Sequence, residues 1–287
     1  MRAPFPYFGG KRTVIDLVWA RLGQPKQYIE PFCGSAAILL GAKEPAPLEV
    51  VGDLNGFIAN FWRAVVHQSD EVARWADYPV SHIDQGARHR WLMGQRDRLG
   101  AELQDPDWPG DAKVAGWWLW GQCSWIGSGW CEWAAGKVPH VSDAGRGVVW
   151  TSSGATAYRW LRELAARMER VRVVHGAWDR CLNHHYGANE TAIFFDPPYL
   201  AFERLYGTGG EPVASQVADW CREHPHLRIA LCGHRGDYRL GGWTEVGWER
   251  ERLTYGSDKT KAEECIWFSP ACHVPEVLGQ RELFAAI

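Results

Sequence analysis

Four successive residues, Asp196, Pro197, Pro198 and Tyr199, combine a carboxylate, two prolines and an aromatic ring. The prolines fix φ at two positions and disfavour helix before them, which indicates a stiff extended turn. A carboxylate and a free carbonyl are both acceptors, so they suit a ligand amine with two N–H donors. The segment therefore indicates a site for a planar, amino-substituted base. A strand end with Asp196 as a helix cap explains the same four residues equally well.

A second set of residues indicates a nucleoside pocket. Gly34 lies in the run Glu-Pro-Phe-Cys-Gly-Ser, where a backbone without a side chain lets a ligand approach a helix N-terminus. Asp53 ends the next expected strand, a position where a carboxylate binds ribose hydroxyls. The run is not G-x-G-x-x-G, so a nucleoside without phosphates fits better than a dinucleotide. The alternative is an ordinary glycine turn and a capping Asp.

The N-terminal run Phe-Pro-Tyr-Phe-Gly-Gly-Lys ends in a cation, Lys11. We expect its ammonium to neutralise a carboxylate, such as the amino-acid end of a ligand, while Tyr7 packs on that ligand. A flexible loop with a solvated lysine is the simpler interpretation of the same run.

The elements that must position these residues alternate between apolar strands and amphipathic helices, which predicts a parallel α/β sheet. Asn55 is expected to cap the helix after Asp53. Asp196 follows a strand directly, at the carboxyl end where open α/β sheets bind ligands. We expect strands at residues 27–29, 48–51, 171–174, 191–195, 227–232 and 264–268, and helices at 13–22, 35–41, after 55, at 158–168 and at 213–224.

The alternation is lost between about Gln68 and Ser153, which indicates an insertion at residues 67–154 into a main domain of residues 1–66 and 155–287. Many of the 18 tryptophans crowd into residues 116–133 of this insertion. Such a stretch is more often core than a surface for stacking on bases. Its arginines form either a phosphate-binding face or a solvated helix face (Arg88, Arg90, Arg96 and Arg98).

Composition places the chain among globular proteins. With 287 residues, of which 46% are hydrophobic, it can bury a core. It has no apolar run of the roughly 20 residues that cross a bilayer and no secretory leader, so we expect a cytoplasmic protein. The 8 cysteines include no C-x-x-C pair, which favours buried thiols over zinc or disulfides. A net charge of −3 does not decide whether the chain binds DNA.

The order of four runs, F-P-Y-F-G-G-K, E-P-F-C-G-S, D-L-N and D-P-P-Y, resembles the Dam-like (D12 class, α-group) adenine-specific DNA methyltransferases. The resemblance implies a Rossmann-like class I methyltransferase sheet at residues 1–66 and 155–287. It also implies a target-recognition domain at 67–154, mainly helical or irregular. The implied activity is methyl transfer from S-adenosyl-L-methionine to the N6 amine of adenine in double-stranded DNA, by base flipping and direct displacement without a metal. A monomer or weak dimer is expected.

The resemblance also implies roles for single residues. Asp196 and the Pro197 carbonyl accept from N6, and Tyr199 stacks on the ring. Pro198 belongs to the predicted catalytic segment through the fixed φ that stiffens the turn. On the cofactor side, the implied residues are Tyr7 and Lys11 in the N-terminal motif, Phe32 and Gly34 beside the methionine portion, Asp53 at the ribose, and Asp196.

One position departs from the family pattern. Ala177 stands where many relatives carry an Asp that meets the cofactor's adenine, and Asp179 comes two residues late. Trp178 or backbone groups are the expected substitutes. The departure leaves open a catalytically silent, DNA-binding relative. N4-cytosine methylation is a further alternative, but its enzymes more often carry Ser where this chain has Asp196.

Overall fold

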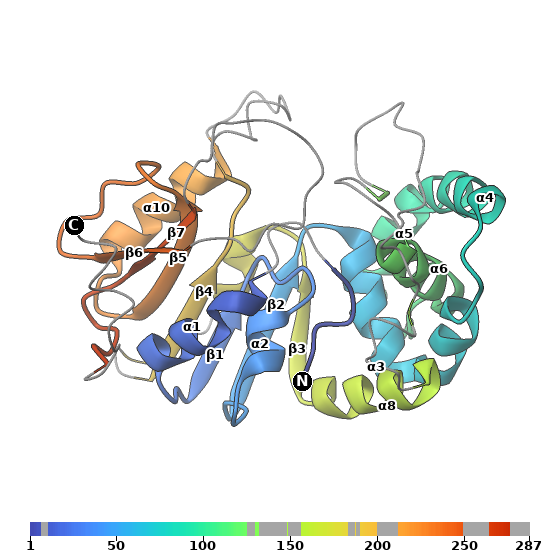
Figure 1. The fold of residues 1–287 in the computed structure, drawn as a ribbon, viewed down its shortest axis with the longest axis horizontal. Helices are drawn as coiled ribbons and strands as arrows, with labels where there is room; N and C mark the ends of the chain where they lie inside the picture. The colour runs from blue at the N-terminus through green and yellow to red at the C-terminus, as the bar shows by residue number, and fades with distance from the viewer. Residues whose placement is uncertain are drawn as a thin grey trace. The chain divides into compact units, whose positions relative to one another are not determined.

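The computed structural model describes residues 1–6, 11–124, 130–131, 148, 156–182, 187, 190–199, 212–248 and 264–275. The fold is mixed α/β, with a seven-stranded sheet in the order β3-β2-β1-β4-β5-β7-β6 (Figure 1). The strands are β1 (Gln27–Glu30), β2 (Leu48–Asp53), β3 (Val171–His175), β4 (Thr191–Phe195), β5 (Arg228–His234), β6 (Thr244–Trp248) and β7 (Glu264–Phe268). All six predicted strands are therefore present, and β6 is an addition.

The pairing of the strands changes direction within the sheet. β1, β4 and β5 are parallel, with Ile29 opposite Ile193 and Ile193 opposite Ile229. β7 then runs antiparallel to both β5 and β6. The carboxyl ends of β1, β4 and β5 consequently meet at one edge, which is where Asp196 follows β4.

Capping side chains begin three of the described helices, after Asn55, Ser81 and Thr156. The Asn55 side chain accepts a hydrogen bond from the Phe57 amide at 3.0 Å, which confirms the predicted cap of α3. α3 continues past residue 66, with a non-helical backbone at Gln68. The helices are η1 (Arg12–Val14), α1 (Ile15–Leu22), α2 (Ala37–Gly41), α3 (Gly56–Ala76), α4 (His82–Met93), α5 (Arg96–Glu102), α6 (Ala112–Ser124), α8 (Ala157–Met168), η2 (Trp178–Leu182) and α10 (Val213–Glu223).

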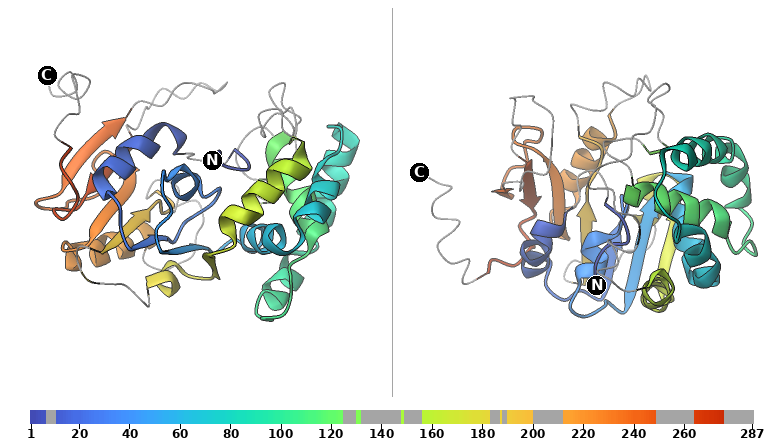
Figure 2. Two further views of the ribbon diagram at one scale, coloured as in Figure 1. Left: turned by 90° about the horizontal axis from the view of Figure 1, so that it is seen from below. Right: turned by 45° about the vertical axis from the view of Figure 1, so that its right-hand side comes forward.

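The chain divides into two compact units, each built from separate stretches. The first unit comprises Met1–Gly10, Cys33–Leu40 and Val51–Arg180, and the second comprises Lys11–Phe32, Gly41–Val50 and Cys181–Ile287. In the first unit, α3 packs against α6 and α8 (Figure 2). In the second unit, β1, β4, β5, β6 and β7 form paired strands. The domain boundaries proposed from sequence remain a prediction.

Aromatic side chains fill much of the first unit. Trp118 and Trp120 of α6 are fully buried, as is Trp130, so these tryptophans belong to the core. Phe5 meets Trp118 edge-on at 4.7 Å between ring centroids. The cysteines are buried free thiols, as predicted. None of the described helices has the length and apolar character that a membrane span needs.

Candidate functional site

Asp196 follows the last residue of β4 and forms an ion pair with Lys11. The Lys11 Nζ atom lies 2.8 Å from Asp196 Oδ2, and the side chains of Lys11 and Asp196 are 4% and 20% exposed. Lys11 Nζ also donates a hydrogen bond to the Tyr199 hydroxyl at 3.0 Å. The structure therefore brings together Lys11, Asp196 and Tyr199, three of the residues predicted from sequence. Lys11 does contact a carboxylate, and in the structure that carboxylate is Asp196.

Burial and charge shift the pKa values of all three groups. Burial is the largest influence on Asp196 and raises its pKa, while the Lys11 ammonium opposes the rise and Glu264 adds to it. Burial lowers the pKa of Lys11, but the attraction of Asp196, Cys232 and Glu264 outweighs it, and the pKa of Lys11 is raised. Burial also raises the pKa of Tyr199, with Asp196 adding to the rise. Lys11 is therefore an ammonium and Tyr199 a phenol near neutral pH.

Residues at the neighbouring strand ends surround this cluster. The His234 ring at the end of β5 meets Tyr199 edge-on, with centroids 4.5 Å apart. The Trp248 ring at the end of β6 lies 5.8 Å from Lys11 Nζ. Glu264 begins β7. Sequence reasoning missed these three residues, because His234 falls two residues after the predicted strand and β6 was not expected.

Asp53, in the first unit, orders the loop that contains Gly34. Its Oδ2 atom accepts from the Gly34 amide at 3.0 Å, and its Oδ1 atom accepts from the Asn55 amide at 2.9 Å. Gly34 has φ of 45°, a left-handed value that favours glycine. A carboxylate is an acceptor that can also bind ligand hydroxyls. The position of Asp53 beside the Gly34 loop is thus compatible with the ribose role expected from the sequence.

The remaining predicted cofactor residues occupy varied positions. Phe32 is half-buried, with its ring centroid 6.5 Å from that of Phe195. Trp178 begins η2 and is half-buried, whereas Ala177 and Asp179 are exposed. Tyr7 lies outside the described residues. The described residues include no group of three or more His, Cys, Asp and Glu side chains that could hold a metal ion.

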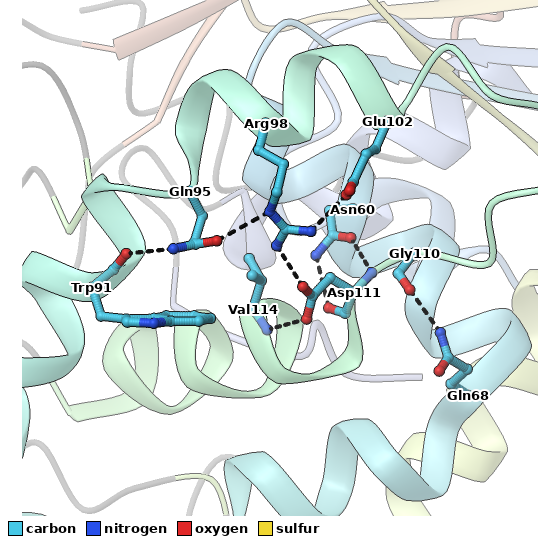
Figure 3. A network of polar contacts seen from close by, with 9 residues as sticks. All are labelled: Asn60, Gln68, Trp91, Gln95, Arg98, Glu102, Gly110, Asp111 and Val114. Carbon is cyan, nitrogen blue, oxygen red and sulfur yellow. Dashed lines mark hydrogen bonds and ion pairs between the residues drawn. The ribbon is translucent and has the colours of Figure 1, made fainter.

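The arginine run at residues 88–98 does not form one solvated face. Arg88 is 7% exposed, and its guanidinium lies 4.2 Å from the Trp120 ring centroid. Arg96 donates to the Met93 sulfur at 3.9 Å. Arg98 forms ion pairs with Glu102 and Asp111, both visible in Figure 3. Arg88 therefore stabilises the packing of the aromatic side chains.

Residues 7–83 match the family model described as D12 class N6 adenine-specific DNA methyltransferase. The matched stretch contains Lys11, Phe32, Gly34 and Asp53, and it ends before Asp196. No curated protein matches the sequence. The match covers most of F-P-Y-F-G-G-K and all of E-P-F-C-G-S and D-L-N, which confirms the resemblance in that part of the chain and supports adenine methylation of DNA as the general activity.

Proposed function

We propose that the chain transfers a methyl group from S-adenosyl-L-methionine to the N6 amine of adenine in double-stranded DNA. The observation that carries this proposal is the buried contact of Lys11 with both Asp196 and Tyr199 at the end of β4. It places a carboxylate acceptor and an aromatic ring together in the turn that the family resemblance assigns to the target base.

Asp196 and Pro197 are proposed to hold the amine. Lys11 occupies Asp196 Oδ2, so Oδ1 and the Pro197 carbonyl are the acceptors for the two N6 hydrogens. Pro197 is buried and Pro198 exposed, which fits a rigid turn with one side facing outward. Tyr199 stacks on the adenine ring. Held in this way, the amine directs its nitrogen lone pair away from the protein acceptors.

The cofactor supplies an electrophilic methyl group on a sulfonium. The amine nitrogen attacks the methyl carbon, so the N–C bond forms as the S–C bond breaks and the sulfonium becomes a neutral thioether. N6 gains the positive charge and would then pass one proton, through the Asp196 carboxylate that accepts its hydrogen bond, to water. The chain contributes positioning and electrostatic stabilisation, with Asp53 proposed at the ribose and with Phe32 and Gly34 beside the methionine portion. The adenine must leave the duplex stack first, and residues 67–154 are the proposed target-recognition domain.

Labelling and nucleoside analysis test the proposal. The protein is incubated with tritiated S-adenosyl-L-methionine and duplex DNA, and the DNA is digested to nucleosides. We expect label in N6-methyladenine alone. Label in N4-methylcytosine would overturn the choice of base, and cofactor and DNA binding without any label would support a silent DNA-binding relative.

A pair of matched variants tests the role proposed for Asp196. Asp196→Asn keeps the shape of the side chain and removes its charge, and we expect loss of transfer by at least about 100-fold with DNA binding retained. Asp219→Asn removes an exposed carboxylate that pairs only locally, with Arg222 on α10, and is the control. Near-normal turnover by Asp196→Asn would refute the role of Asp196.

A further inference from the structure

Two contacts from separate parts of the chain hold the Tyr199 ring. At its tip, the hydroxyl accepts a hydrogen bond from Lys11 Nζ at 3.0 Å. At its side, the His234 ring at the end of β5 lies edge-on, with the ring centroids 4.5 Å apart and the ring planes at 71°. Tyr199 is buried, and His234 is half-buried beside it. His234 is therefore, like Lys11, a direct neighbour of the ring that is proposed to stack on adenine.

The two contacts restrain different motions. The hydroxyl oxygen lies on the axis about which a tyrosine ring rotates, so the hydrogen bond from Lys11 fixes the direction of that axis and leaves rotation about it free. This rotation is soft by itself, because the terminal torsion of an aromatic side chain has broad minima. A second ring that packs edge-on at the side resists the rotation through close contact. His234 thus restrains the plane of the Tyr199 ring.

A hydrogen-bonded turn positions His234. The His234 amide donates to the Asp237 carboxylate at 2.7 Å, and the Asp237 amide donates to the His234 carbonyl at 2.9 Å. Tyr238 is buried, and its hydroxyl donates to the Cys232 carbonyl at 3.3 Å. Gly233 permits this packing, because a Cβ atom there would lie 2.6 Å from the Tyr238 ring. The backbone at His234 is therefore anchored on both sides.

The plane of Tyr199 matters for methyl transfer. A base that stacks on an aromatic ring lies nearly parallel to it, so the plane of Tyr199 sets the plane of the adenine. The N6 amine lies in that plane, and it must meet Asp196 and the Pro197 carbonyl while its nitrogen faces the methyl group. A displacement of about 1 Å in such a geometry costs about 100-fold in rate.

We propose that His234 is a positioning residue for adenine methylation, whose ring fixes the plane of Tyr199 and thereby orients the target base toward the methyl donor. It acts through Tyr199 and does not touch the reacting atoms, so it is not a catalytic residue. The inference rests on the proposed function, because it assumes that Tyr199 stacks on the adenine.

Steady-state kinetics on genomic DNA without adenine methylation separate positioning from binding. In His234→Ala, we expect kcat to fall by about 10- to 100-fold, while KM for S-adenosyl-L-methionine and for DNA stays within about 3-fold of wild type. His234→Phe keeps a flat ring and loses the polar atoms, so its kcat should stay within about 3-fold of wild type. His234→Gln keeps polarity and size without the flat ring; it should behave as His234→Ala does and replaces it if the alanine variant folds poorly. His224→Ala is the matched control, since the His224 ring stacks on Trp220 at 3.9 Å in the same unit, and it should keep wild-type kinetics.

NMR of the full-length protein without ligands tests the restraint itself. Tyrosine is labelled on the ring, and Tyr199→Phe assigns the Tyr199 signals. We expect separate signals for the two edges of the Tyr199 ring in wild type and in His234→Phe, because the ring rotates slowly, and one averaged signal in His234→Ala. Equal ring rotation in wild type and His234→Ala would overturn the inference, as would an unchanged kcat in folded His234→Ala or an equal loss in His234→Phe. If wild type transfers no methyl group, the proposed function fails; an active wild type whose Tyr199 ring is unrestrained refutes this inference alone.

Discussion

The ion pair of Lys11 and Asp196 leads to a prediction about the stability of the fold that does not depend on any ligand. Lys11→Met removes the ammonium but preserves much of the side-chain volume, and it leaves the buried Asp196 carboxylate without its partner. At 2.8 Å, two unit charges attract by about 6 kcal/mol at an effective dielectric constant of ~20. Desolvation offsets part of this attraction, so we expect Lys11→Met to lower the free energy of unfolding by about 3 kcal/mol.

The pH dependence of this loss has a definite sign. The folded-state pKa of Lys11 is raised, so its stabilisation is complete below the ordinary lysine pKa and is lost only as pH rises through the higher folded value. Without Lys11, the ammonium no longer opposes the effect of burial, so the pKa of Asp196 rises further and its carboxyl is protonated more readily as the pH falls. The penalty of Lys11→Met should therefore be larger at about pH 8 than at about pH 5.

Urea denaturation of four proteins measures the effect: wild type, Lys11→Met, Asp196→Asn and the double variant. A double-mutant cycle removes the separate cost of each substitution and isolates the pair. We expect a coupling energy of about 2–4 kcal/mol at about pH 8. A coupling below about 0.5 kcal/mol, or a Lys11→Met penalty that is equal at both pH values, would show that the pair does not stabilise the fold as argued.

Two further predictions concern the first unit. Asn60 is fully buried and exchanges two hydrogen bonds with the Asp111 backbone, at 3.1 and 2.7 Å (Figure 3). Asn60→Ala should lower the free energy of unfolding by about 2–4 kcal/mol, because two backbone groups lose their partners. Arg98→Ala removes exposed ion pairs and should lower the free energy of unfolding by under about 1 kcal/mol. Chemical denaturation measures both variants, and equal losses of stability in Asn60→Ala and Arg98→Ala would contradict this reasoning. Ala177→Asp should tighten binding of S-adenosyl-L-methionine by about 10-fold in calorimetry, as one added charged hydrogen bond predicts; an unchanged affinity would indicate that other groups hold the adenine.

The sequence predicts the strands whose side chains are buried. β4 is buried at every position and β5 at all but its last, so their apolar runs stand out between turn residues. The Asn55 cap is equally visible, since its bond is to a residue two positions away. The cap depends on neighbours in the chain and the strands depend on burial of apolar residues, and both signals can be recognised from the sequence alone.

The sequence did not predict β6, and the reason is physical. Thr244 and Glu245 are exposed and the other three residues are half-buried, so no strict alternation marks the strand. It lies at the end of the sheet order and pairs with β7 alone. Its formation depends on β7, which follows 15 residues of chain later. A weakly apolar edge strand of this kind is specified by its partner and not by its own composition.

The same distinction applies to the candidate site. Sequence identified Lys11, Asp196 and Tyr199 by type and order, because prolines and glycines make both runs conspicuous. It did not identify the Lys11–Asp196 ion pair, since a lysine can satisfy any carboxylate that the fold brings near. His234 was still less visible, because it follows the predicted strand and belongs to no motif. Only the fold brings its ring against Tyr199. A residue that acts by packing on another leaves no motif, so this part of a site must be found from the fold.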